Sequence, residues 1–503
     1  MQGAIRNSAT SQPVHKASIL LAPAQAADDW QRTLTATSDS AGNFAFANIT
    51  PGKYRLRVIR QGFLTLDHPT IYDFSTPQQR KDIDIRLTPH GVIAGRILDA
   101  DGEPLDRVQL QLLQPRYRNG RKTLATIRSA YSNDLGEFRW PGLAPGKYYV
   151  FASHIEGVPL PISNTEDYVP IYYPNSPDIT AAIPIDVAPG AQIRLADMAL
   201  PRSRTATVKG RVIVEIPGAR VTPVVRFFRQ PGHDSTGATS QRFQSASINS
   251  AGEFIIRNIT PGPYIASAQA EKNGVSFGGG ANLTVTSDLD GITVTIPNPV
   301  TLSGRIRVEN DAPADLTRVR IQIQRQASGS ESYPLKPGAV FQLDHVTPAH
   351  YFIRATNLPE GFYTKRVLAE STDITTTGID LKSGAPPSID ILISPKAGKI
   401  SGVVVDPESS QPSPGATIAI VPKDKQLRNL TEHTTADPEG RFRFSNLTPG
   451  DYFLYSWKEV ESGAWFDPEF LAPLEEKAIS VTIAESAQST HQLTAIAPAA
   501  QTK

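Results

Sequence analysis

A Phe followed by a Tyr ten residues later recurs five times along this chain of 503 residues, and this spacing constrains the fold more than any other feature. The Tyr ends a short phrase, "NITPGKY" in the first copy, which returns as "NITPGPY" and "NLTPGDY" and more loosely as "GLAPGKY" and "HVTPAHY". The five pairs are Phe44/Tyr54, Phe138/Tyr148, Phe254/Tyr264, Phe341/Tyr351 and Phe442/Tyr452. Successive Tyr residues lie 87 to 116 positions apart, a period that is the size of a domain and too long for the units of a solenoid.

A second landmark precedes each Phe by 37 to 44 residues, namely a Gly that opens an apolar run. These residues are Gly3, Gly95, Gly210, Gly304 and Gly402. Because both landmarks keep their register while the sequence between them drifts, we interpret each copy as one folded unit, called a repeat below.

The residues around each pair predict a corner between two β-strands. Asp39 precedes Gly42 by three residues, and in the second copy Asp134 precedes Gly136 by two. This spacing is typical of turns in which a carboxylate accepts backbone N–H groups and Gly takes a positive φ. The alternation in "FAF", "FRW", "FII" and "FRF" places the first and third side chains on one strand face.

The Pro-Gly that follows fits the central positions of a type II turn. A Tyr at such a corner can bury its ring and hydrogen-bond to nearby backbone, as in the tyrosine corner of immunoglobulin-like sandwiches. We therefore expect a hairpin-like corner that each repeat makes once.

Helical periodicity is absent, and strand-like runs such as "VQLQLL", "VRIQIQ" and "SIDILIS" alternate with turn residues. The predicted fold class is all-β, with five tandem antiparallel β-sandwich modules of the immunoglobulin/transthyretin-like kind. The expected boundaries are 1–88 (short at its N-terminus), 89–203, 204–298, 299–396 (divergent) and 397–496, with a tail at 497–503.

Composition excludes several functions. The chain carries 50 basic and 49 acidic residues with no basic block, so nucleic acid is a poor partner. It has no Cys, which excludes disulfides and thiol chemistry, and no apolar run long enough to span a membrane. No export signal is visible. We interpret "SILLAPAQA" from Ser18 as a strand, which leaves room for an export signal upstream.

The second repeat carries the clearest family resemblance. Its opening "GRILDADGEPLDRVQLQLL" and its later "DLGEFRWPGLAPGKY" resemble the carboxypeptidase regulatory-like domain. The resemblance is also specific in the fifth repeat, good in the first and third, and weak in the fourth. The resemblance implies a transthyretin-like, seven-stranded sandwich in the carbohydrate-binding-like group, of the kind found in multi-module bacterial envelope proteins. In metallocarboxypeptidases this domain is an accessory, so the resemblance implies no catalytic residue.

The residues themselves also predict no enzyme, no metal site and no cofactor. None of the nine His residues begins an H-x-x-E pair, and no G-x-S-x-G elbow or P-loop is present. Asp288 and Asp290 are two oxygen ligands where calcium takes six to eight, so a solvated turn is the expectation there. The glycine run at Gly278 is interpreted as a flexible hairpin tip.

Aromatic residues are the one feature beyond the repeated pattern. The hypothesis is that their rings stack on a ligand such as a sugar, and the competing interpretation is that they pack on the adjacent sheet or the next repeat. The candidate ligand-binding residues are Tyr168, Tyr172, Tyr173, Trp457 and Trp465.

Together these features predict a non-catalytic adhesion or spacer scaffold at the cell surface, in the periplasm or outside the cell, with glycans or envelope proteins as partners. The alternatives are carbohydrate binding through the aromatic loops, or an accessory role beside an enzyme or outer-membrane receptor on another chain. The short linkers predict a particle between extended and folded back, with a radius of gyration above about 32 Å, against about 23 Å for a single globule.

Overall fold

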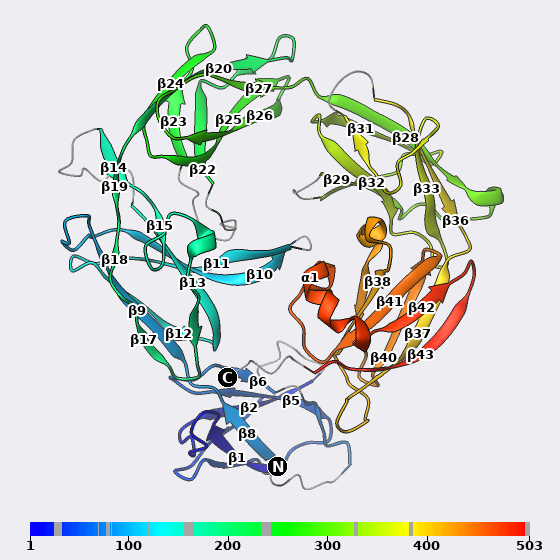
Figure 1. The fold of residues 1–503 in the computed structure, drawn as a ribbon. Helices are drawn as coiled ribbons and strands as arrows, with labels where there is room; N and C mark the ends of the chain where they lie inside the picture. Colours follow the sequence, from blue (N-terminus) through cyan, green and yellow to red (C-terminus); the bar gives the residue numbers. More distant parts are fainter. Residues whose placement is uncertain are drawn as a thin grey trace.

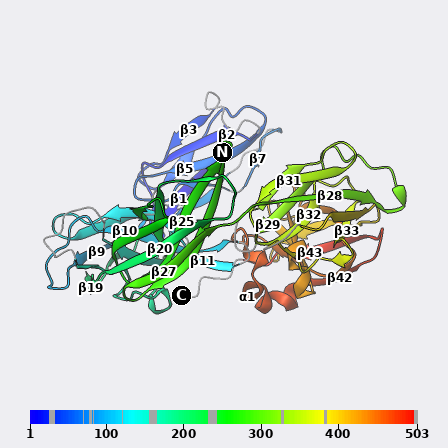
Figure 2. The ribbon, with the colours of Figure 1, turned by 90° about the horizontal axis from the view of Figure 1, so that it is seen from above.

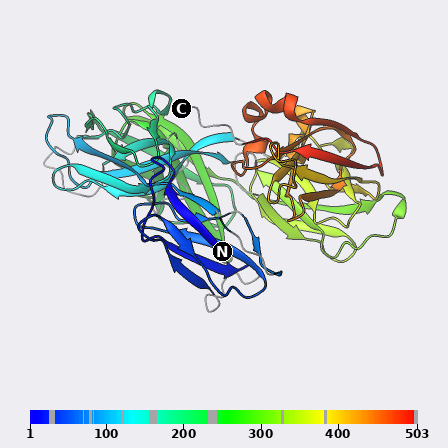
Figure 3. The same cartoon turned by 90° about the horizontal axis from the view of Figure 1, so that it is seen from below.

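The computed structural model describes residues 1–24, 33–68, 70–76, 81, 83–118, 121–154, 165–230, 232, 243–325, 330–381 and 386–497. Strands dominate these residues, and α1 (Pro468–Leu471) is the one α-helix among them. The all-β prediction is confirmed. Figure 1 shows groups of strands following one another around a ring. Figures 2 and 3, from above and below, show the blue, cyan and green strands on one side and the yellow-green to red strands on the other.

The strands of the first repeat are β1 (Gln2–Asn7), β2 (Ser18–Pro23), β3 (Leu34–Thr37), β4 (Asn43–Ala45), β5 (Lys53–Ile59), β6 (Leu66–Asp67), β7 (Tyr72–Asp73) and β8 (Ile83–Leu87). Those of the second are β9 (Gly91–Leu98), β10 (Gln109–Arg118), β11 (Arg121–Tyr131), β12 (Glu137–Leu143), β13 (Gly146–Ser153), β14 (Glu166–Tyr168), β15 (Ile171–Tyr172), β16 (Ile185–Val187), β17 (Gln192–Arg194), β18 (Met198–Ala199) and β19 (Arg202–Arg204), with the 3₁₀ turn η2 (Ile179–Ala181).

The third repeat contains β20 (Ala206–Val214), β21 (Arg220–Val221), β22 (Val224–Arg229), β23 (Phe243–Ser247), β24 (Glu253–Ile259), β25 (Gly262–Lys272), β26 (Val275–Val285) and β27 (Leu289–Ile296). The fourth contains β28 (Val300–Val308), η3 (Glu309–Asp311), β29 (Arg320–Arg325), β30 (Ser330–Pro334), β31 (Val340–Val346), β32 (His350–Thr356), β33 (Tyr363–Ala369), β34 (Thr372–Asp373), β35 (Ile379–Asp380) and β36 (Ile389–Ser394).

The fifth repeat contains β37 (Gly398–Val405), β38 (Thr417–Pro422), η4 (Lys425–Leu430), β39 (Glu432–Thr435), β40 (Arg441–Leu447), β41 (Gly450–Trp457), η5 (Ala464–Phe466), α1, η6 (Ala472–Lys477), β42 (Ile479–Ile483) and β43 (Gln488–Thr494).

Each repeat builds two main sheets on one plan. In the first sheet the opening strand lies between the Phe strand and the closing strand, as β1 lies between β4 and β8. The second sheet pairs the second strand with the Tyr strand, as β2 pairs with β5. The same two pairings occur in β9/β12/β17 with β10/β13, β20/β24/β27 with β22/β25, β28/β31/β36 with β29/β32, and β37/β40/β43 with β38/β41.

This plan corrects two expectations. The Phe and Tyr strands lie in different sheets, so the corner between them crosses from sheet to sheet and is not a hairpin. The first sheet is also not wholly antiparallel, because the opening and closing strands run parallel. A parallel pair needs a long connection, and the whole repeat supplies it.

The two landmarks of the sequence are cross-strand partners. Gly3 lies opposite Phe44, and the other four repeats have the same register. A Cβ placed on Gly402 would lie 2.7 Å from the ring of Phe442 and 1.8 Å from the carbonyl oxygen of His491. The Phe ring therefore lies over a Gly that has no room for a side chain, which explains why both residues recur.

The Tyr hydroxyl ties the corner together, as predicted. Each hydroxyl donates to the carbonyl oxygen four residues earlier, over 2.7 to 3.1 Å. These bonds join Tyr54 to Thr50, Tyr148 to Ala144, Tyr264 to Thr260, Tyr351 to Thr347 and Tyr452 to Thr448.

The prediction of a type II turn at the Pro-Gly is wrong. A type II turn needs a φ near +80° at the Gly, whereas the four Gly residues before the Tyr have φ of 148° to 156°. The left-handed residue is instead the first of the phrase, with φ of 54° to 73° in four repeats: Asn48, Gly142, Asn258 and His345.

In four of the five repeats, the turn before the Phe uses a side-chain acceptor three residues ahead of its Gly. In the second repeat this acceptor is Asn133 and not Asp134, because the Oδ1 of Asn133 accepts the N–H groups of Leu135 and Glu137. Asp39, Asn249 and Asp437 accept in the same pattern. The expectation for Gly278 is also wrong, since this residue lies within β26, and the tip of that hairpin is at Asn273 and Gly274.

Five large clusters of buried apolar side chains each draw on a single repeat. The landmark rings belong to them. In the second repeat Phe138 and Trp140 point into the core while Arg139 is exposed, so the predicted strand faces are confirmed. We propose that each cluster with its sheets is one domain, with the boundaries expected from the sequence.

Candidate functional site at the junctions between repeats

The predicted aromatic residues of the second repeat lie mostly inside the protein. Tyr168 is 4% exposed and Tyr172 is 2% exposed, while Tyr173 is half-buried. The Tyr172 ring packs on Phe151 with centroids 4.8 Å apart, and its hydroxyl hydrogen-bonds to the backbone of Gly232 in the third repeat. Burial raises the pKa of Tyr172 well above its usual value. This Tyr therefore joins two repeats.

The two Trp residues of the fifth repeat are buried as well, Trp457 at 2% and Trp465 at 5% exposure. The Trp457 ring stacks on Tyr455 with centroids 5.4 Å apart, and the Trp465 ring lies 4.6 Å from that of His433. Since sugar stacking needs an open ring face, this burial favours the packing interpretation. Ligand binding by the five aromatic residues stays a prediction.

The segment 460–477, which we call the apron, covers the outer face of the second sheet of the fifth repeat. It includes η5, α1 and η6, and its side chains form a second apolar cluster with Trp457 and its neighbours, outside the main core. Asp467 caps α1 by accepting the N–H of Glu469 over 2.9 Å. The apron thus turns the two Trp rings from exposed strand or loop residues into buried ones.

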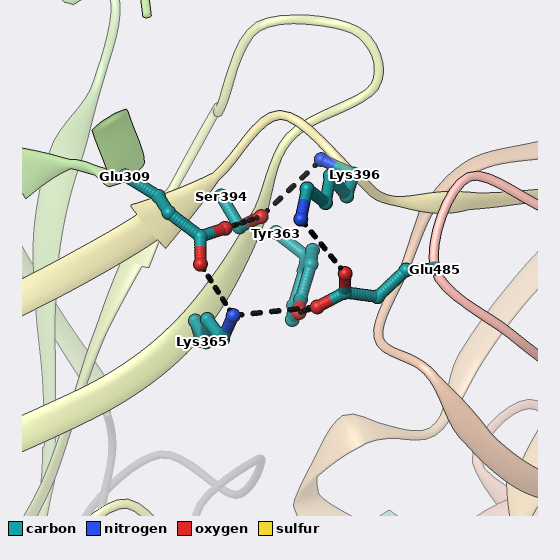
Figure 4. Close-up of polar contacts among 6 residues, drawn as sticks. All are labelled: Glu309, Tyr363, Lys365, Ser394, Lys396 and Glu485. Atoms are coloured by element: carbon teal, nitrogen blue, oxygen red, sulfur yellow. Dashed lines mark hydrogen bonds and ion pairs between the residues drawn. The ribbon is translucent and has the colours of Figure 1, made fainter. Parts of the chain in front are cut away.

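A charged network joins the fourth repeat to the fifth (Figure 4). The Lys365 ammonium lies 2.5 Å from a Glu309 oxygen and 3.3 Å from a Glu485 oxygen, and Lys396 contacts the other Glu485 oxygen at 3.1 Å. The buried Ser394 hydroxyl donates to Glu309 over 2.5 Å. Hydrogen bonds from Lys365 and Ser394 lower the pKa of Glu309, and those from Lys396 and Lys365 lower the pKa of Glu485.

Asn446 makes the second part of this junction. Its Oδ1 accepts the Gly361 N–H over 3.0 Å, and its Nδ2 donates to the carbonyls of Leu358 and Pro359 over 3.2 and 3.1 Å. Nearby, Glu360 of the fourth repeat pairs with Lys399 and Arg443 of the fifth.

Sequence reasoning missed this role of Asn446. An Asn at the start of the phrase also occurs at Asn48 and Asn258, so the residue type gives no signal. The conformation differs, because those two have a positive φ and Asn446 is not among the residues that do.

A third contact joins the second repeat to the apron and closes the ring in Figure 1. The hairpin of β10 and β11 reaches α1 in all three ribbon views. The Tyr117 N–H donates to Glu461 over 3.2 Å, Arg116 lies 3.7 Å from the same carboxylate, and the Tyr117 ring meets Phe470 edge-on at 5.7 Å. Burial, followed by nearby carboxylates, raises the pKa of Tyr117.

Metal chemistry finds no support among the described residues, where no three His, Cys, Asp or Glu side chains group together. Asp288, in the connection between β26 and β27, accepts the N–H of Thr207 in β20, and Asp290, within β27, accepts the N–H of Gly291. The turn expected at these two residues is therefore wrong for Asp290, which lies in a strand. No helix in the described part of the chain is both long and apolar enough to cross a membrane.

No curated protein matches this chain. Among solved structures it is similar to the minor pilin GBS52 of Streptococcus agalactiae, at 16% identity over 40% of this chain and 96% of that one, with a TM-score of 0.22. It is also similar to two B repeat units of the collagen binding protein of Staphylococcus aureus, at 11% identity over 75% and 94% of the two chains, with a TM-score of 0.16.

A third similar structure is BcpA, the major pilin subunit of Bacillus cereus, at 10% identity over 80% and 99% of the two chains, with a TM-score of 0.15. TM-scores of this size do not establish a common arrangement of the repeats. The family comparison is more specific. The carboxypeptidase regulatory-like domain matches residues 1–88 and 399–458, so this chain carries that domain, as its repeated phrase predicted, in its first and fifth repeats.

Proposed function

We propose that this chain is a non-catalytic scaffold of tandem β-sandwich domains that works at the cell surface or outside the cell in adhesion or spacing. The junction between the fourth and fifth repeats carries the proposal. Its polar contacts join one repeat to the next, with Asn446 holding three backbone groups and Lys365 shared between two carboxylates. Contacts of this kind fix the angle between domains, which a spacer requires and an isolated binding domain does not.

Hydrogen exchange across this junction tests the scaffold. Asn446→Ala removes one acceptor and two donor bonds, so the amide of Gly361 should exchange faster while amides in the two cores stay protected. Asn446→Asp is the matched control, since it keeps the acceptor for Gly361 but cannot donate to the two carbonyls. If Asn446→Ala leaves exchange at Gly361 unchanged, the junction does not hold the repeats together and the scaffold proposal fails.

The absence of catalysis is tested separately. Purified chain incubated with peptides that have a free C-terminus should release no terminal residue, with or without added zinc. Release that depends on the metal and stops with a chelator would show an enzyme.

Carbohydrate binding is the second candidate, and Tyr173 is the residue that favours it, because its ring is half-buried where the other four candidates are buried. A glycan array probed with the intact chain tests it. Binding that Tyr173→Ala abolishes would support a sugar site in the second repeat. An array without signal would contradict carbohydrate binding and leave the scaffold as the single proposed function.

A further inference from the structure

The hairpin of β10 and β11 and the apron of the fifth repeat meet through complementary groups. The hairpin offers the Arg116 guanidinium, the Tyr117 N–H and the Tyr117 ring. The apron offers the Glu461 carboxylate and the Phe470 ring. Two residues of each surface therefore make an ion pair, a hydrogen bond and a contact between aromatic rings.

No short connection forces this contact. Tyr117 and Glu461 are 344 positions apart, and the third and fourth repeats lie between them. The contact therefore joins two surfaces that are far apart along the chain, and it adds to the junctions between repeats that are neighbours in sequence.

The two surfaces differ from each other, which makes the contact heterologous. A heterologous contact closes a ring when both surfaces belong to one body, and it links bodies head to tail when they do not. Within one chain the contact benefits from an effective concentration of the order of mM, so a single chain closes first.

We propose that the apron is also a docking surface for the β10–β11 hairpin of a second copy of this chain, so that copies join head to tail once the ring opens. The second copy carries the same Arg, N–H and ring in the same geometry. After docking, each copy still presents one free hairpin or one free apron, so the assembly can grow.

Engineered disulfides test both forms of the contact, because the chain has no Cys of its own. A Cβ on Gly463 would lie 3.4 Å from the Cβ of Tyr117, close to the roughly 3.5–4.5 Å that a disulfide spans. The double variant Tyr117→Cys/Gly463→Cys should form a cross-link within one chain at low concentration, visible as faster migration on a non-reducing gel.

The decisive arm mixes two single variants, Tyr117→Cys on one chain and Gly463→Cys on the other. At concentrations near about 1 mM, comparable to the effective concentration, the mixture should give a disulfide-linked dimer. Leu135→Cys mixed with Gly463→Cys is the control, since Leu135 is exposed and lies beyond the far end of β11 from the hairpin tip. A mixture that gives no more dimer than this control overturns the proposal.

A second test does not depend on Gly463→Cys. Gly463 has a φ of +88°, which a Cys adopts poorly, so strain alone could prevent the disulfide. This test exchanges the charges of Arg116 and Glu461. In light scattering, the average mass of the unaltered chain should rise with concentration. Glu461→Arg should abolish the rise, and adding Arg116→Glu should restore it. A mass that stays that of one chain at every concentration, or a loss that the exchange does not rescue, contradicts docking between copies.

Discussion

Gly402 has no space for even a methyl group, since a Cβ there would meet the backbone carbonyl of His491 as well as the Phe442 ring. Gly402→Ala should therefore destabilise the fifth repeat by about 1–3 kcal/mol or more, because the backbone of the parallel strand has to move. Gly278→Ala is the control, as no atom of the described residues lies within 4 Å of its Cβ position. Denaturant melts of both variants check this, and equal midpoints would show that the ring and Gly are not in contact.

The second prediction at this scale concerns the strand faces. Phe138→Ala removes a core ring that packs on Trp140 at 5.0 Å and should cost about 3–5 kcal/mol. Arg139→Ala removes an exposed side chain and should change stability by roughly 0.5 kcal/mol or less. Hydrogen exchange of the amides of β12 in the full chain measures both. Similar effects of the two changes would mean that the faces are assigned wrongly.

Sequence reasoning found the recurring Gly, Phe and Tyr, because spacing is visible in a single chain. It could not find why they recur. The contact of Gly402 with Phe442 depends on which strands pair, and the local sequence around either residue does not show this pairing. The bond from Tyr452 to Thr448 was predictable because it is local, only four residues long.

At the scale of elements, the strands were predictable and their pairing was not. Alternating side chains define a strand face, so "FRF" and its relatives gave the buried positions correctly. The partner of a strand is set by contacts far along the chain, and so the step from β40 to β41 crosses between sheets where a hairpin was expected. The burial of Trp465 has the same cause, since it depends on the apron folding over β38 and β41.

The junction between the fourth and fifth repeats should weaken in acid. The folded state lowers the pKa of Glu309 and of Glu485, so each carboxylate stabilises the junction above its ordinary pKa and loses this contribution as pH falls through the lowered value. Below about pH 4.5, the protection of the Gly361 amide relative to its intrinsic exchange rate should fall before the cores open. Glu309→Gln should remove part of this pH dependence, and an unchanged profile would contradict the role of the network.

At the scale of the whole molecule, the ring in Figure 1 replaces a straight string of repeats. Five domains of about 13 Å strung end to end have a radius of gyration of roughly 50 Å, and a single globule of this length has about 23 Å. Small-angle scattering of the dilute chain should give a value between these limits and above about 32 Å. The double change Tyr117→Ala/Glu461→Arg should raise it, because the hairpin then leaves the apron. An unchanged radius would mean that the junctions alone hold the curve.

The contact between Tyr117 and Glu461 also has a mechanical consequence. If the chain is pulled from its two ends, tension passes from the second repeat directly into the fifth, and the third and fourth repeats carry no load. The contact rests on two residues of each surface, so it should break before any sandwich unfolds. Its rupture then releases the length of two folded domains at once. The molecule would therefore extend reversibly. It would lengthen under a sudden pull, when the contact breaks, and shorten again when the contact re-forms.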